Sequence, residues 1–181
     1  MESAKGNQSK WGHLYSSRPR QPSRSDLKRA EWLASHQAEV RILKKNTVLL
    51  VEDSKVQKLA NERILHKGGY LVINTGDGEE AVRVAREKVP DLILLDMLLP
   101  KLSGPEVLQA LKQDPATARI PVIVLSSLPQ CNEAKLAQEG AANYFEKSRL
   151  FDNAAGEASF LDMISKVLCK SSEGKALAAG T

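Results

Sequence analysis

Four consecutive leucine and isoleucine residues, Leu92–Leu95, form an unbroken apolar stretch of strand length, and Asp96 follows directly. A strand buried on both faces of a parallel sheet has such a run, because neither of its faces alternates toward water. Pro100 and Gly104 then mark a loop. A carboxylate at the carboxyl end of such a strand lies where open α/β sheets bind their ligands. Taken alone, Asp96 could equally serve only to turn the chain.

Strand-like and helix-like segments alternate along the rest of the chain from Thr47 onward. Short links between five strand–helix repeats predict an α/β fold with a doubly wound, five-stranded parallel sheet in the flavodoxin-like order 2-1-3-4-5. The expected strands are Thr47–Val51, Tyr70–Asn74, Leu92–Leu95, Ile120–Leu125 and Asn143–Glu146, and the later helices are Glu79–Glu87, Gly104–Lys112, Asn132–Glu139 and Phe160–Leu168. A first helix is expected between Ser54, its cap, and the Gly68–Gly69 pair.

The chain divides into four parts on composition. Residues 1–25 are rich in Ser, Gln, Gly, Arg and Pro and are expected to be disordered. Residues 26–45 predict an amphipathic helix that begins at Ser25 and Asp26, and this helix could dock on the body or form a homodimer with a second copy. Residues 46–170 form the α/β domain, and residues 171–181 are expected to be a flexible tail of small residues.

The charge is concentrated at the amino end. The segment through Asn46 carries ten Lys and Arg residues against four Asp and Glu residues, within a whole-chain net charge of +4. A basic segment can contact nucleic acid, anionic lipid or an acidic partner. We favour a solvated tail instead, because no helix-turn-helix or zinc-ligand pattern accompanies it. Nucleic-acid binding is therefore not expected.

The predicted location is the cytoplasm, with no membrane contact. No apolar run is long enough to span a bilayer, and the amino terminus lacks the pattern of a signal peptide. Cys131 and Cys169 are isolated from one another and from other metal-ligand residues, so two reduced thiols are expected.

Polar residues follow four of the five expected strands: Glu52 and Asp53, Asp96, Ser126, and Lys147. The predicted strand order brings these ends to one rim of the sheet. Carboxylates gathered there repel one another, and Mg²⁺ resolves this because it prefers carboxylate, carbonyl and water oxygens. A metal, an ammonium group and a hydroxyl near one carboxylate could stabilise a transferring phosphoryl group, with Asp96 as the nucleophile.

Each of these residues also has an ordinary explanation. Glu52 and Asp53 could be the acids of a helix start, Ser126 a turn residue, and Lys147 a solvated charge. Because all of these residues occur at equivalent strand ends, a shared functional site is favoured over four separate explanations.

Residues Thr47–Lys170 resemble the receiver domain of two-component response regulators. The resemblance rests on the acid pair after the first strand and on three motifs, DLILLDMLLPKLSG, IPVIVLSS and GAANYFEKS. It implies that Asp96 is the phosphorylation site. It also implies that Mg²⁺ is held by Asp53, Asp96 and the backbone carbonyl of Leu98, with Glu52 acting through a water on the metal.

The resemblance also assigns switch residues. Ser126 matches the switch hydroxyl, Lys147 the lysine that pairs with the phosphoryl group, and Tyr144 the aromatic residue that swings inward when Ser126 is drawn to that group. Without the resemblance, Tyr144 would be an amphipathic residue at the sheet edge.

The sequence departs from the family pattern in three respects. Ser148 follows Lys147 where the family usually has a proline in a cis peptide, so we expect a trans bond. The link Ser148–Glu157 is longer than usual. Leu98 and Leu128 occupy positions flanking the site where polar residues often orient the hydrolytic water, which gives the hypothesis that the phosphorylated form is long-lived.

The function implied by the resemblance is a stand-alone, phosphorylation-dependent response regulator. Its partners would be a histidine kinase or phosphotransfer protein and a downstream protein target, and it would be no enzyme beyond its own phosphorylation and dephosphorylation. The first alternative is a pseudo-receiver, a binding scaffold that is never phosphorylated. The second is a phosphohydrolase or phosphotransferase acting on outside substrates, which would need a further acid near Leu98.

Overall fold

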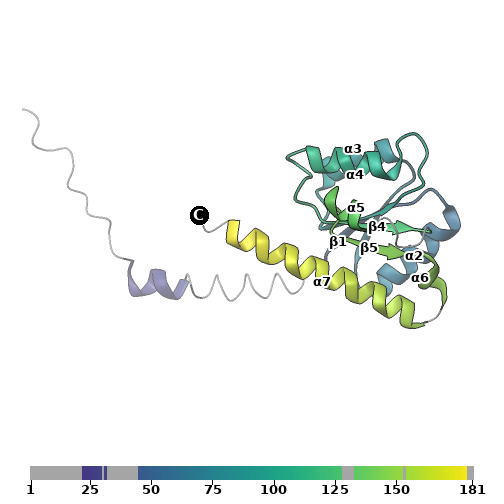
Figure 1. Cartoon of the computed structure of the whole chain (residues 1–181). Coiled ribbons are helices and arrows are strands. Elements are labelled where there is room, and N and C mark those ends of the chain that lie inside the picture. Colours follow the sequence, from purple (N-terminus) through teal and green to yellow (C-terminus); the bar gives the residue numbers. More distant parts are fainter. Residues whose placement is uncertain (1–21, 30, 32–44, 128–132, 153, 179–181) are drawn as a thin grey trace, which may run out of the picture. The chain divides into compact units, whose positions relative to one another are not determined.

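In the computed structural model, the described residues are 22–29, 31, 45–127, 133–152 and 154–178. The chain forms two units, Met1–Lys44 and Lys45–Thr181. The second unit contains the whole sheet (Figure 1).

The sheet has five parallel strands in the order β2-β1-β3-β4-β5, which confirms the predicted topology. Its strands are β1 (Thr47–Val51), β2 (Leu71–Thr75), β3 (Leu92–Asp96), β4 (Val122–Ser126) and β5 (Asn143–Glu146). The helices of this unit are α2 (Lys55–Lys67), α3 (Gly78–Lys88), α4 (Gly104–Gln113), α5 (Glu133–Gln138), α6 (Ser148–Asp152) and α7 (Ala154–Ala178).

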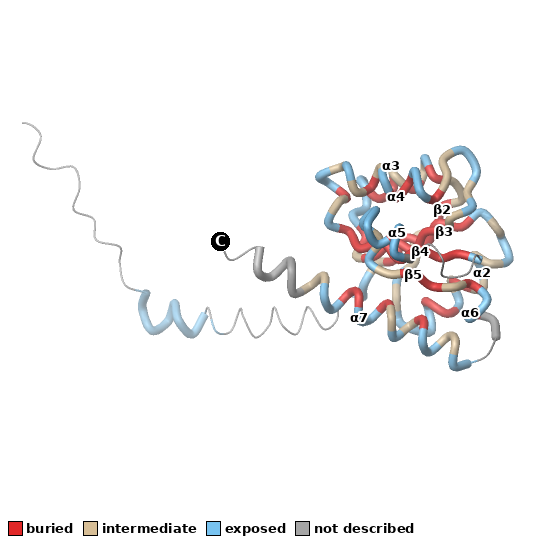
Figure 2. The backbone as a smooth tube through the Cα atoms, viewed as in Figure 1, coloured by how far each residue is buried: buried red, intermediate tan, exposed pale blue. Residues whose placement is uncertain are grey.

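Helices cover both faces of the sheet (Figure 1). One aliphatic core lies between the sheet and α3, α4 and α5, and it contains Leu49, Leu95 and Leu111. A second core lies between the opposite face and α2, α6 and α7, where Phe145 and Phe160 lie with their ring centroids 4.9 Å apart. The central strands β1, β3 and β4 are buried along nearly their whole length (Figure 2). This two-sided burial is why their sequences are continuous apolar runs.

Two helices begin beside the polar rim, and in each a capping side chain accepts a hydrogen bond from the backbone N–H three residues later. The Ser54 side chain accepts a hydrogen bond from the Gln57 N–H and starts α2 just after the acid pair. Asp77 likewise accepts from the Glu80 N–H at 2.8 Å and starts α3.

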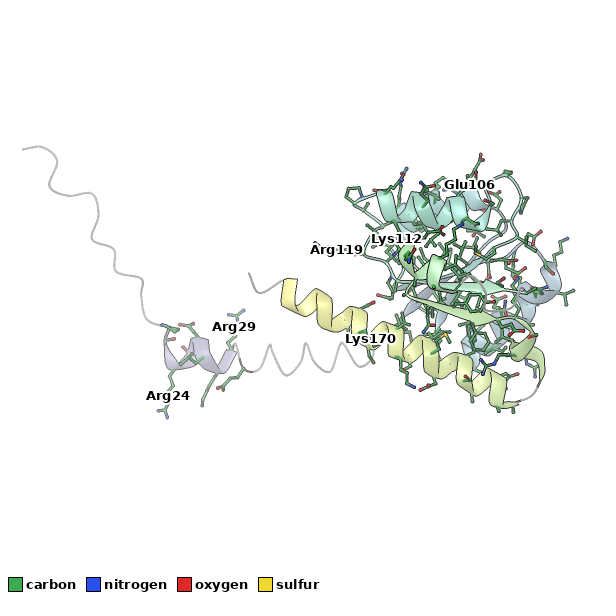
Figure 3. The ribbon with its side chains drawn as sticks, viewed as in Figure 1. Arg24, Arg29, Glu106, Lys112, Arg119 and Lys170 are labelled. Carbon is green, nitrogen blue, oxygen red and sulfur yellow. The ribbon has the colours of Figure 1, made fainter. Side chains whose placement is uncertain are left out.

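Lys112 ties α4 to the start of β4. Its half-buried ammonium group, on the side chain labelled in Figure 3, donates to the carbonyls of Ala118 at 3.1 Å and Ile120 at 2.8 Å. Burial lowers the pKa of Lys112. These two contacts hold the end of α4 to the segment that leads into β4.

The carboxyl-terminal region differs from the prediction. The last helix begins at Ala154, earlier than the expected Phe160, and it continues to Ala178. Most of the expected tail, residues 171–178, is therefore helical. Extending an existing helix costs no new nucleation, and Ala176, Leu177 and Ala178 are good helix formers. The short helix α6 occupies the long link after Lys147.

The amino-terminal helix begins two residues earlier than predicted. Residues 24–29 are helical, and Ser23 is the cap: its backbone N–H donates to the Asp26 carboxylate at 2.9 Å, while the Asp26 N–H donates to the Ser23 hydroxyl at 3.2 Å. This reciprocal pair is favoured because Asp26 lies three residues after Ser23. The rest of the predicted helix, residues 30 and 32–45, falls outside the described residues except for Lys45, which is not helical.

Within the described residues, no helix is both long enough and apolar enough to cross a bilayer.

Candidate functional site

The polar residues expected at one rim do lie there, because the strands that carry them are neighbours. Glu52 and Asp53 follow β1, Asp96 is the last residue of β3, and Lys147 follows β5. Asp96 pairs in register with Leu125, so Ser126, the last residue of β4, lies one residue farther along the rim. The Lys147 N–H donates to the Ser126 carbonyl at 2.8 Å and continues the pairing of β4 and β5 beyond the strand ends.

Three carboxylates form a compact acidic cluster at this rim. Oxygen atoms of Glu52, Asp53 and Asp96 all lie within 4.8 Å of one another. Glu52 and Asp96 are buried, whereas Asp53 is exposed to solvent. Closely spaced carboxylate oxygens with one exposed member match the oxygen-rich coordination that Mg²⁺ takes in proteins, so the residues present fit this ion.

Lys147 pairs with two of the three acids of the cluster. Its Nζ atom is 2.7 Å from Glu52 Oε2 and 2.7 Å from Asp96 Oδ2, and the lysine residue is only 5% exposed. The same nitrogen donates to Gln57 Oε1 at 2.8 Å. A buried lysine is costly unless its charge is paired and its N–H groups are bonded, and both conditions are met here.

Glu52 is the most deeply buried acid of the cluster, with no exposed surface. Burial raises the pKa of its carboxyl group, the Lys147 hydrogen bond opposes this rise, and the nearby charge of Asp96 adds to it. Its second oxygen accepts a hydrogen bond from the Ser54 N–H at 3.2 Å. Glu52 is therefore fixed from two sides.

The loop after Asp96 is anchored at both of its ends. The Leu98 N–H donates to Asp96 Oδ1 at 3.2 Å, and the Gly104 N–H donates to the Met97 carbonyl at 3.2 Å. In the middle of the loop, Lys101 pairs with Asp77 at 2.7 Å and adopts a positive φ of 65°. The loop that would carry the Leu98 carbonyl toward a metal is thus held to α3 as well as to α4.

The two predicted switch residues are both buried. Ser126 is 5% exposed and Tyr144 is 7% exposed. Tyr144 packs into the core that contains Val107 and Leu111 of α4, and it pairs in register with Val124, two residues before Ser126. Tyr144 therefore lies on the edge strand of the sheet, as its sequence pattern suggested, and its side chain is a core residue in this conformation.

The family profile described as response regulator receiver domain matches residues 48–154, which is more than half of the chain. The chain belongs to the response regulator receiver domain family.

Relatives in this family agree with the assignment. The polar-differentiation response regulator DivK of Brucella anthropi is 37% identical over 102 residues, which cover 56% of this chain and 83% of that protein. Among solved structures, a response regulator from Chloroflexus aurantiacus matches with a TM-score of 0.62 at 27% identity, covering 70% of this chain and 99% of that one. A receiver domain of a Pseudomonas aeruginosa sensor histidine kinase, solved with magnesium in its active-site cleft, matches with a TM-score of 0.60 at 27% identity, covering 69% and 98%.

Most residues predicted for the receiver site are therefore brought together. Glu52, Asp53, Asp96 and Lys147 form one cluster, and the Leu98 backbone adjoins it. The Leu98 side chain is 70% exposed, and Leu128 lies outside the described residues. The peptide bond after Lys147 is trans, as predicted for Ser148, because no cis peptide occurs in the described part of the chain.

Sequence reasoning missed Gln57. It lies in the first turn of α2, where polar residues usually face solvent, and no motif or spacing distinguished it from its neighbours. Its role in the site is visible only from the contact with Lys147.

Proposed function

We propose that this protein is a phosphorylation-dependent response regulator that accepts a phosphoryl group on Asp96 with Mg²⁺ and signals through contacts with other proteins. The observation that carries the proposal is the convergence of Lys147 on Asp96 inside the acidic cluster, with 2.7 Å between Nζ and Oδ2. A structural ion pair alone would not need two further carboxylates beside it, since their mutual repulsion is unfavourable without a cation.

The chemistry is a phosphoryl transfer between two anionic partners. An Asp96 oxygen forms a new bond to phosphorus while the bond from phosphorus to the donor breaks, and the donor leaves with the electron pair of that bond and takes up a proton from solvent. Lys147 remains beside the new acyl phosphate and donates to a phosphoryl oxygen in place of Asp96 Oδ2. Mg²⁺ held by the acidic cluster would supply positive charge that offsets the phosphoryl oxygens.

Ser126 and Tyr144 fit the role of a two-state readout. Ser126 is next to the register partner of Asp96, so its hydroxyl can be drawn toward a phosphoryl group on the neighbouring strand. Tyr144 packs under α4 on the strand beside it. A shift of Ser126 would therefore alter the packing of α4 against β5, and phosphorylation would bias the surface there.

Exposed apolar side chains near the site support the proposal that the phosphoryl donor and the downstream target are proteins. Val56 and Leu59, three residues apart on α2, are 77% and 68% exposed. Exposed neighbouring apolar groups are typical of protein contact surfaces. The donor that we propose is a histidine kinase or phosphotransfer protein, with small acyl phosphates as simple substitutes.

We further propose that the protein acts on no external substrate and works in the cytoplasm. A phosphohydrolase would use an additional acid where the exposed Leu98 stands. A free thiol on exposed Cys169 suits a reducing compartment.

Binding of beryllofluoride, a phosphoryl mimic, tests the proposal against the scaffold alternative. With Mg²⁺ present, amide NMR signals of Ser126 and Lys147 should shift on adding beryllofluoride, and the Asp96→Asn variant should show no shift. A wild-type protein that does not respond, or that responds equally without Mg²⁺, would identify a scaffold instead.

A further inference from the structure

The ammonium group of Lys147 has three hydrogen-bond partners of two kinds. Two are carboxylates of the acidic cluster, Glu52 Oε2 and Asp96 Oδ2, each at 2.7 Å. The third is the neutral amide oxygen of Gln57 at 2.8 Å. A lysine ammonium has three N–H donors, so this set uses all of them. Since Lys147 is only 5% exposed, water cannot readily replace a missing acceptor.

Gln57 is itself fixed by a closed ring of contacts. The Glu52 carboxylate accepts from the Ser54 N–H at 3.2 Å, the Ser54 hydroxyl accepts from the Gln57 N–H at 3.5 Å, and the Gln57 side chain accepts from Lys147. Lys147 closes the ring through its ion pair with Glu52. The start of α2 thus sets the position of the Gln57 amide relative to the lysine.

Phosphorylation changes the two carboxylate acceptors of Lys147 but leaves the neutral acceptor, Gln57, unchanged. On phosphorylation, Asp96 gains a phosphoryl group, and Glu52 belongs to the cluster that would accept the cation. Gln57 carries no charge and takes part in neither event. A glutamate at this place would add a fourth acid to the cluster, close to the incoming phosphoryl oxygens.

We infer that Gln57 is a positioning residue, which holds Lys147 Nζ beside Asp96 while the carboxylate partners of the lysine are exchanged for phosphoryl oxygens. The inference rests on the proposed function and assigns to α2 a part in forming the phosphoryl-binding pocket. Gln57 itself does not contact the phosphoryl group; it acts through Lys147.

The Gln57→Met variant tests this inference, because methionine matches glutamine in length and removes the acceptor. NMR titration should give a beryllofluoride affinity lower by on the order of tenfold in saturating Mg²⁺, as expected for losing a hydrogen bond to a charged group. The Mg²⁺ affinity should stay close to that of the wild type. Gln109→Met, at an exposed glutamine of α4, is the matched control and should change neither affinity.

A double-mutant cycle separates positioning from a general loss of structure. In the Lys147→Met background, Gln57→Met should cause no further loss of beryllofluoride affinity, because its effect passes through the lysine. If Gln57→Met does not fold, Gln57→Asn replaces it, since its amide ends one methylene short of Lys147, and the same loss is expected.

Two results would overturn the inference while leaving the proposed function intact. Gln57→Met could bind beryllofluoride as tightly as the wild type, or it could lower the affinity equally with and without Lys147. If the wild type itself shows no Mg²⁺-dependent binding, the proposed function fails, and the inference fails with it.

Discussion

Lys147 reaches across β4 to pair with Asp96: its Nζ atom lies 2.7 Å from Asp96 Oδ2, although the lysine follows β5 and the aspartate ends β3. Adjacent strands are about 4.8 Å apart, so the lysine side chain, its hydrogen bond and the aspartate side chain together bridge two strand spacings. This contact joins the ends of β1, β3 and β5 in one pocket, because Lys147 also pairs with Glu52 after β1. A shorter cation at the same position could not contact the carboxylate.

Because Leu98 is exposed beside Asp96, we expect Leu98→Asn to speed hydrolysis of the phosphorylated protein. An amide there can orient the attacking water, and one such hydrogen bond is worth about 1 kcal/mol, or roughly a fivefold rate change. The loss of phosphate from isolated phosphoprotein over time measures this rate.

Leu59→Asn is the control for Leu98→Asn, because Leu59 is similarly exposed but lies on α2. It should leave the decay unchanged. Equal decay in wild type and Leu98→Asn would contradict the idea that an apolar residue at this position prolongs the phosphorylated state.

Gly104 leaves no room for a side chain next to the phosphorylation site. A Cβ atom there would lie 2.5 Å from the Asp96 carbonyl oxygen and 2.5 Å from the Met97 Cα atom, both of which are backbone. Gly104→Ala should therefore displace the loop, lower the free energy of unfolding by about 1–3 kcal/mol and weaken Mg²⁺ binding. Urea unfolding and a Mg²⁺ titration measure the two effects.

The control for this loop is Gly76→Ala. A Cβ atom at Gly76 would meet only the Lys58 ammonium at 3.6 Å, an ordinary contact with a flexible side chain. Mg²⁺ binding as tight in Gly104→Ala as in Gly76→Ala would show that the loop does not depend on this close approach.

Asp77 should make the stability of the fold depend on acid pH. The Glu80 N–H and then the Lys101 ammonium hold the pKa of Asp77 below its ordinary value of 3.8. A carboxyl group with a lowered folded pKa stabilises the fold above its unfolded pKa, and this stabilisation is lost as the pH falls through the folded pKa.

Asp77→Asn keeps an acceptor for the helix cap but removes the charge. It should therefore be less stable than wild type near neutral pH, and the difference should shrink below 3.8. Urea unfolding of both proteins near neutral pH and below pH 3.8 measures this difference in the free energy of unfolding. A difference that stays constant over this range would exclude the charge of Asp77 as its cause.

The sheet and the site were predictable for the same physical reason. Strands buried on both faces need unbroken apolar runs, so the limits of Thr47–Val51 were predicted to the residue. The limits of the edge strand Asn143–Glu146 were also predicted, although it has polar residues at both ends. Parallel strands then bring their polar carboxyl ends to one rim, so Asp96 and Lys147 were predicted to lie at one site, and their side chains are in contact there.

What escaped prediction depends on contacts that leave no periodic pattern. Gln57 looks like any polar residue in a first helical turn, and its contact with Lys147 arises only because the first turn of α2 lies beside the residue that follows β5. The inward packing of Tyr144 depends on the position of α4. The length of α7 follows from propagation of a helix that is already formed, which composition alone does not reveal.

The most direct test of the account is the mass of the intact protein after incubation with a small acyl phosphate. With Mg²⁺, the wild type should gain the mass of one phosphoryl group, whereas Asp96→Asn and wild type with a Mg²⁺ chelator should gain none. Absence of the adduct in wild type with Mg²⁺, or an equal adduct in Asp96→Asn, would contradict the claim that Asp96 is the phosphoryl acceptor.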